Sequence, residues 1–140
     1  MNILKKSLVR IASHLFPNQI TAFAYNYLTN PQIRKLRTNE LVTLEKANKA
    51  KYKFKDFDIQ LYIWKGGEKN VLLIHGWEGQ AGNFSDLIEK LLASGFTVYS
   101  FDAPSHGFSS TGKTNFFEFT ELAGILIKKV GVKLLVSHSF

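Results

Sequence analysis

Residues 132–140 read Val-Lys-Leu-Leu-Val-Ser-His-Ser-Phe, and this stretch decides how the rest of the chain is interpreted. The apolar, β-branched run in its first half is typical of a short buried strand. A serine just past the carboxyl end of such a strand is well placed for nucleophilic chemistry. Ser139 is therefore the first candidate for a catalytic residue.

Upstream of this stretch, predicted strands alternate with predicted helices. Alternating side chains predict a hairpin of two half-exposed strands within residues 52–64, and the apolar run at 71–74 predicts a central strand covered on both faces. A helix, a strand at 97–101, a second helix at 116–130 and the final strand follow. This order predicts an α/β fold with a mostly parallel sheet and right-handed crossovers.

The carboxyl ends of parallel strands carry the reactive loops in such sheets, and three loops fall there: residues 75–82, 102–114 and 137–140. In the first, Gly76 allows a sharp turn that leaves backbone amides free to stabilise an oxyanion, although an ordinary strand-to-helix turn also fits. In the second, we expect Asp102 to bind loop amides rather than to act as an acid or base.

Three segments together resemble the serine-nucleophile type of the α/β-hydrolase superfamily. They are Val-Leu-Leu-Ile-His-Gly-Trp at 71–77, Phe-Asp-Ala-Pro-Ser-His-Gly-Phe-Ser at 101–109 and Leu-Val-Ser-His-Ser-Phe at 135–140. They are similar to the family's oxyanion strand, its Asp-x-Pro-x-His-Gly-x-Ser loop and its nucleophile elbow. The resemblance implies that Ser139 is the nucleophile and that the amides of Trp77 and Phe140 are the oxyanion donors, with no cofactor and no metal ion.

The activity implied by the resemblance is an esterase-, lipase- or acyl-hydrolase-like attack on a small-molecule acyl substrate. Two features depart from the family pattern: Ser137 replaces the first glycine of the elbow, and the second glycine would be residue 141. The family's triad runs serine, acid, histidine along the chain, whereas all four histidines here precede Ser139. We therefore expect residues 51–140 to be the N-terminal half of a hydrolase domain, inactive by itself because the triad acid and base are missing.

Residues 1–50 lie outside the resemblance and are predicted to form a helical N-terminal extension. Leucine and isoleucine spacing predicts a helix up to Pro17, a second stripe at 20–28, and a third helix that begins after Asn30 as its N-cap and fades near Lys49. Residues 1–55 carry a net charge of +9, and residues 56–140 carry −2. This split argues against a nucleic-acid partner and leaves two roles for the basic helices, packing on the main body or peripheral contact with a membrane.

The composition sets further expectations. A chain of 140 residues holds one modest domain, and the absence of cysteine excludes disulfides and fits a cytoplasmic protein. Arg10 and His14 interrupt the first apolar stretch, so no signal peptide is predicted, and no run reaches the length of a membrane span.

Two alternatives from other classes stay open. Residues 107–114, from Gly107 to Thr114, fit the Gly-x4-Gly-Lys-Thr pattern of a phosphate-binding loop, which would indicate a nucleotide-binding protein. Against it, no later apolar strand ends in Asp to hold Mg²⁺; in the hydrolase interpretation Thr114 is instead a helix N-cap. The second alternative is a non-enzymatic protein whose basic helices bind a membrane or a partner.

Overall fold

The computed structural model of the protein describes residues 3–32 and 35–139, and its chain divides into two compact units, Met1–Asn30 and Pro31–Phe140. The units divide earlier than the boundary near residue 50 that we expected. The elements are α1 (Ile3–Leu15), α2 (Pro17–Leu28), α3 (Thr38–Glu45), β1 (Asn48–Phe54), β2 (Phe57–Trp64), β3 (Lys69–Ile74), the 3₁₀ helix η1 (Ala81–Phe84), α4 (Ser85–Ala93), β4 (Phe96–Phe101), α5 (Phe116–Val130) and β5 (Leu134–Ser137).

The first unit contains α1 and α2, the two helices predicted from the leucine and isoleucine spacing. Pro17 occupies the first turn of α2, where its missing N–H removes no hydrogen bond. At the other end, the Thr29 hydroxyl donates to the carbonyl of Tyr25 and satisfies one of the last carbonyls of α2.

The third predicted helix is wrong at both ends. Residues 31–32 and 35–37 are not helical, α3 begins only at Thr38, and Ile33 and Arg34 lie outside the described residues. The Arg37 amide donates to the Glu40 carboxylate at 2.7 Å, so Glu40 rather than Asn30 satisfies the start of the helix. The residues near Lys49 belong to β1 because they pair with β2 from Asn48 onward.

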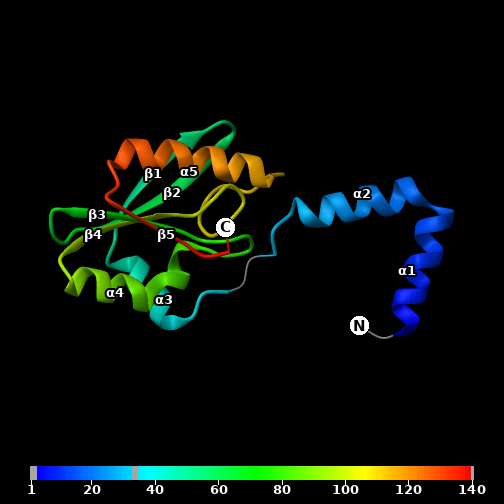
Figure 1. Ribbon diagram of the computed structural model, residues 1–140, viewed down its shortest axis with the longest axis horizontal. Coiled ribbons are helices and arrows are strands. Elements are labelled where there is room, and N and C mark those ends of the chain that lie inside the picture. Colours follow the sequence, from blue (N-terminus) through cyan, green and yellow to red (C-terminus); the bar gives the residue numbers. More distant parts are fainter. Residues whose placement is uncertain (1–2, 33–34, 140) are drawn as a thin grey trace. The chain divides into compact units, whose positions relative to one another are not determined.

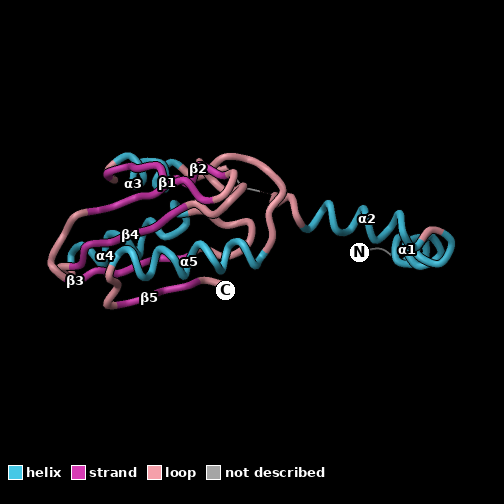
Figure 2. The backbone as a smooth tube through the Cα atoms, turned by 90° about the horizontal axis from the view of Figure 1, so that it is seen from above, coloured by secondary structure: helices cyan, strands magenta, loops and turns pink. Residues whose placement is uncertain are grey.

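The five strands form one mixed sheet in the order β1-β2-β4-β3-β5 (Figure 2). The predicted hairpin is confirmed: β1 pairs antiparallel with β2, which pairs antiparallel with β4. The predicted parallel part is confirmed as well, because β3 pairs in parallel with both β4 and β5. In a parallel sheet the loops that follow β3, β4 and β5 emerge at one edge.

Helices cover both faces of the sheet, with α5 on one side and α3 and α4 on the other (Figure 1). Leu72 and Ile74 of β3 pack in the core cluster that includes Phe119 of α5. Val71 and Leu73 belong to the opposite cluster, which contains Leu44 of α3 and Ile88 of α4. The prediction that β3 is a central strand covered on both faces is confirmed.

The final strand, β5, is less buried than its apolar sequence predicted. Leu134 is 42% exposed and Leu135 is 46% exposed. The physical reason is position: among the described residues β5 pairs with β3 alone, at the end of the strand order, so its side chains have fewer neighbours than those of β3.

The ends of α5 define the loop in front of β5. The N-cap is Asn115, whose side-chain oxygen accepts from the Glu118 amide at 3.1 Å, and not Thr114 as predicted. The Thr114 hydroxyl instead donates to the Glu118 carboxylate. Gly131 ends the helix with a φ of 64°, a left-handed conformation that suits glycine.

Candidate active site

Ser139 follows the last strand in a strained backbone conformation. The strand ladder extends through His138, whose amide donates to the carbonyl of Ile74 at 3.0 Å. Directly after it, Ser139 has a φ of 54°, in the left-handed region that non-glycine residues seldom adopt. Strain of this kind is frequent at functional sites, and it falls within the predicted nucleophile elbow, residues 137–139, which is called the elbow below.

Gly76 touches this elbow from the neighbouring strand. A Cβ added at residue 76 would lie 2.6 Å from the His138 carbonyl oxygen and 2.9 Å from the Ser139 Cβ. Residue 76 must therefore be glycine for the two loops to approach this closely. The carboxyl end of β5 accordingly lies beside the loops that follow β3 and β4 (Figure 1).

Each predicted oxyanion donor directly follows one of the two touching residues in the sequence. Trp77 follows Gly76, and its ring packs edge-on against His106 with the ring centroids 5.1 Å apart. Among the residues that the structure describes, no acceptor takes the Trp77 amide. The second predicted donor, Phe140, lies outside the described residues.

Two buried histidines tie the loop after β3 to the loop after β4. The Ala103 amide donates to His75 Nε2 at 3.0 Å, and the Glu78 amide donates to His106 Nε2 at 3.1 Å. The other nitrogen of each ring faces a backbone carbonyl: His75 Nδ1 lies 2.8 Å from the Gly76 oxygen and His106 Nδ1 2.8 Å from the Pro104 oxygen. Each ring is therefore neutral, with its proton on Nδ1.

These contacts give the two histidines structural roles. Burial lowers the pKa of His75 to about 3 and also lowers the pKa of His106. Neither ring has a nitrogen left to accept a proton from a serine hydroxyl. The general base of a serine hydrolase must therefore be another group.

Asp102 is the third link between the loops, and it was predicted to bind loop amides. Its carboxylate accepts from the amides of Ala81 and Phe108, each at 2.8 Å, and from the Tyr62 hydroxyl at 2.9 Å. Burial raises the pKa of Asp102 and the pKa of Tyr62. A Cβ at Gly107 would collide with the carboxylate, which explains a glycine with a φ of 48° at this position. The prediction for Asp102 is confirmed.

The geometry of residues 107–114 does not suit a phosphate-binding loop, which needs free backbone amides at a helix N-terminus. The loop's amides are already bound to protein acceptors, namely those of Phe108, Ser109, Ser110 and Gly112. In addition, α5 begins only at Phe116, beyond the Lys-Thr pair.

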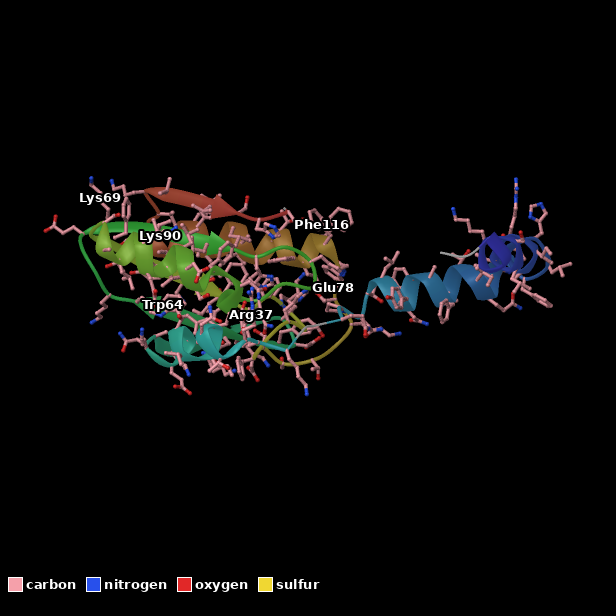
Figure 3. The ribbon with its side chains drawn as sticks, turned by 90° about the horizontal axis from the view of Figure 1, so that it is seen from below. Arg37, Trp64, Lys69, Glu78, Lys90 and Phe116 are labelled. Carbon is pink, nitrogen blue, oxygen red and sulfur yellow. The ribbon has the colours of Figure 1, made fainter. Side chains whose placement is uncertain are left out.

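A cleft of about 480 Å³ opens beside the elbow. It is lined by Lys35, Arg37, Glu40, Gly76, Trp77, Glu78, Gly79, Asn83 and His138. Two of these lining residues, Arg37 and Glu78, are labelled in Figure 3. The cleft thus joins the turn after β3 to the start of α3.

Glu40 is the residue of this cleft that the sequence analysis missed. Its side chain is buried and accepts from the Arg37 side chain, with Nη2 at 3.1 Å, and from Asn83 Nδ2 at 3.3 Å. This arrangement fixes α3 against η1. Glu40 is the first acidic residue of a basic N-terminal segment, and that isolation was the signal available in the sequence.

Within residues 3–32 and 35–139, no three His, Asp or Glu side chains are grouped so that they could hold a metal ion.

Comparison with known proteins identifies the class to which this fold and site belong. A model of the alpha/beta hydrolase family matches residues 71–140, which include the turn at Gly76, the Asp102 loop and the elbow. The chain belongs to the alpha/beta hydrolase family. No curated protein sequence matches it.

Solved structures with the same fold carry different activities. A thioesterase domain from the curacin biosynthetic pathway is 25% identical with a TM-score of 0.57, over 66% of this chain and 35% of that one. An epoxide hydrolase from Vigna radiata is 19% identical, with a TM-score of 0.58 over 68% and 32% of the two chains. A soluble variant of monoglyceride lipase from Saccharomyces cerevisiae is 20% identical, with a TM-score of 0.57 over 66% and 33%. This chain therefore spans about a third of their length.

Proposed function

We propose that the chain supplies the nucleophile and the oxyanion turn of a serine hydrolase that transfers acyl groups to water. Ser139 attacks the carbonyl carbon of an ester, thioester or amide, and the leaving group departs as the acyl-enzyme forms. Water then attacks the acyl-enzyme and regenerates the serine hydroxyl. The amide of Trp77, together with that of Phe140, holds the negative charge that develops on the carbonyl oxygen.

The observation that carries this proposal is the contact between the strained Ser139 and Gly76. Ser139, with a φ of 54° directly after a parallel strand, has a strained conformation of the kind that clusters at functional sites. Gly76 approaches Ser139 closely, and Trp77, whose amide is the proposed donor, follows Gly76 directly in the sequence. A serine nucleophile next to a backbone donor is the minimal arrangement for acyl transfer.

The proposal assigns the triad acid and base to residues that follow Ser139 in the chain, as the family's order requires. His75 and His106 are occupied at both ring nitrogens, and His14 and His138 also precede Ser139 in the chain. Residues 1–140 alone are therefore expected to be inactive, because an unassisted serine hydroxyl is a weak nucleophile.

Among the activities of the similar structures, the nucleophile favours acyl transfer over epoxide opening. Epoxide opening by this fold would use a carboxylate nucleophile, whereas residue 139 is a serine. We propose an ester-like small molecule as the substrate. We also propose the cytoplasm as the location, because the chain contains no cysteine and disulfides are rare in cytosolic proteins.

The direct test is hydrolysis of p-nitrophenyl butyrate and of a butyryl thioester by the full-length gene product. Ser139→Ala should lower kcat by at least about a thousandfold on both substrates. Ser94→Ala, at an exposed serine after α4, is the matched control and should keep wild-type rates. Undiminished hydrolysis by Ser139→Ala would overturn the proposal.

A further inference from the structure

The two helices of the first unit present apolar side chains to solvent. On α1, Leu8 is 61% exposed and Leu15 is 67% exposed, and with Ile11 they fall on one helical face. Lys6, Arg10 and His14 recur every fourth residue on the opposite face, and all three are exposed. The helix α1 is therefore amphipathic, with an apolar face and a basic face.

The second helix, α2, is rich in aromatic residues, and its large apolar side chains are exposed as well. Phe23 is 71% exposed, and Tyr25, Tyr27 and Leu28 are exposed as well. No described residue of α2 is buried. Tyrosine combines an apolar ring with a polar hydroxyl, and it is enriched where one end of a side chain is in lipid and the other in water.

The charge of this segment is of one sign. Residues 1–30, the first unit, contain three Lys and Arg and no Asp or Glu. The remainder of the chain does not offer the opposite sign, since residues 31–140 hold 15 Lys and Arg against 11 Asp and Glu. Charge complementarity therefore points away from this chain and toward an anionic partner.

We infer that α1 and α2 form a peripheral anchor that binds the surface of an anionic lipid bilayer. An amphipathic helix at such a surface buries its apolar face at the boundary between headgroups and acyl chains and keeps its basic residues at the lipid phosphates. The aromatic side chains of α2 fit the same boundary. This inference does not depend on the proposed hydrolase activity.

The helices fit a position on the bilayer rather than across it. No helix of residues 3–32 and 35–139 combines the length and the apolarity needed to span a membrane. At 13 residues, α1 is about 20 Å long, shorter than a hydrocarbon core of about 30 Å. Basic residues along its length would also be placed in hydrocarbon if it crossed the bilayer.

Co-sedimentation of the full-length gene product with vesicles tests the inference. The vesicles are pure phosphatidylcholine or phosphatidylcholine with about one third phosphatidylserine. We expect binding to the anionic vesicles, weakened as salt rises from about 0.1 M to about 0.5 M, because salt screens the attraction. Absence of binding to the anionic vesicles would overturn the inference and would leave an acidic protein as the partner. Equal binding to both vesicle types would also overturn the inference.

Two pairs of variants separate the anchor from the rest of the chain. K6E/R10E should lose roughly thirtyfold or more in affinity for the anionic vesicles, whereas K65E/K113E, at exposed lysines of the second unit, makes the same charge change and should stay near wild type. L8S/L15S should also lose binding, whereas Phe117→Ser, at a side chain of α5 that is 84% exposed, should not. Circular dichroism checks that each variant is folded. Equal losses in anchor variants and controls would contradict the inference.

Discussion

Gly76 and Ser139, 63 positions apart in the sequence, touch at the edge of the sheet so closely that a Cβ on residue 76 would lie 2.9 Å from the Ser139 Cβ. The parallel pairing of β3 with β5, which aligns Ile74 with Ser137, brings the two residues together. The contact joins the turn that carries the Trp77 amide to the serine that would need it.

The first prediction concerns the missing side chain at residue 76. Gly76→Ala introduces a methyl group that would lie 2.6 Å from the His138 carbonyl oxygen, so β5 or the turn must shift. Overpacking of this kind costs about 1–3 kcal/mol. We expect the free energy of unfolding to fall by that amount and the rate of ester hydrolysis to fall more steeply, because the oxyanion donor is displaced from Ser139.

Gly124→Ala is the matched control for this substitution. Residue 124 lies inside α5, and a Cβ there meets no heavy atom within 4 Å. Alanine should stabilise the helix by about 0.5–1 kcal/mol and leave hydrolysis unchanged. If urea unfolding and kinetics gave the same result for both alanine variants, the contact between Gly76 and Ser139 would control neither stability nor hydrolysis.

The second prediction concerns the carboxylate that holds both loops. Asp102→Asn replaces an acceptor of three hydrogen bonds with an amide group whose NH₂ must face one of the donors Ala81, Phe108 or Tyr62. Leaving buried donors unpaired costs about 1–3 kcal/mol. Urea denaturation should show a loss in that range. Asp56→Asn, on the exposed turn between β1 and β2, should be close to neutral, and a similar loss there would contradict the role of Asp102.

The third prediction concerns pH. Burial lowers the pKa of His75 to about 3 from its usual 6.5, so between these values the unfolded chain binds a proton that the folded chain does not. Stability should therefore fall as the pH drops below about 6.5, with His75 contributing up to about 1.4 kcal/mol per pH unit. The buried His106, whose pKa is also lowered, adds to the same trend.

Urea unfolding at several pH values between about 7 and about 5 checks this slope. His75→Gln removes the titrating group and should make the dependence shallower, even though the variant is less stable overall. An unchanged slope in His75→Gln would show that His75 does not control the pH dependence.

Much of the sheet could be predicted from the sequence because local patterns carry it. Alternation identified β1 and β2, and the continuous apolar run identified β3 as a strand covered on both faces. The loop glycines and Asp102 indicated where the site loops lie. The family resemblance then assigned a role to Ser139.

The predictions from the sequence failed where long-range contacts decide the structure. The run at 134–136 has the composition of a buried strand, but exposure depends on neighbouring strands, and in the described part of the chain β5 has one neighbour in the sheet. The start of α3 depends on a side chain at residue 40 that also binds Asn83, a partner 43 positions away. The hydrogen bonds of His75 and His106 between the loops could not be predicted either, because such contacts leave no periodic pattern in the sequence.

The central claim is that Ser139 is the nucleophile, and the most direct measurement is the site of covalent modification. The full-length gene product is treated with a fluorophosphonate, digested, and the modified peptide is sequenced by mass spectrometry. The phosphonyl group is expected on the Ser139 oxygen, and Ser139→Ala should leave the protein unlabelled. Modification of another serine, such as Ser137 or Ser105, with Ser139 unmodified, would contradict the assignment.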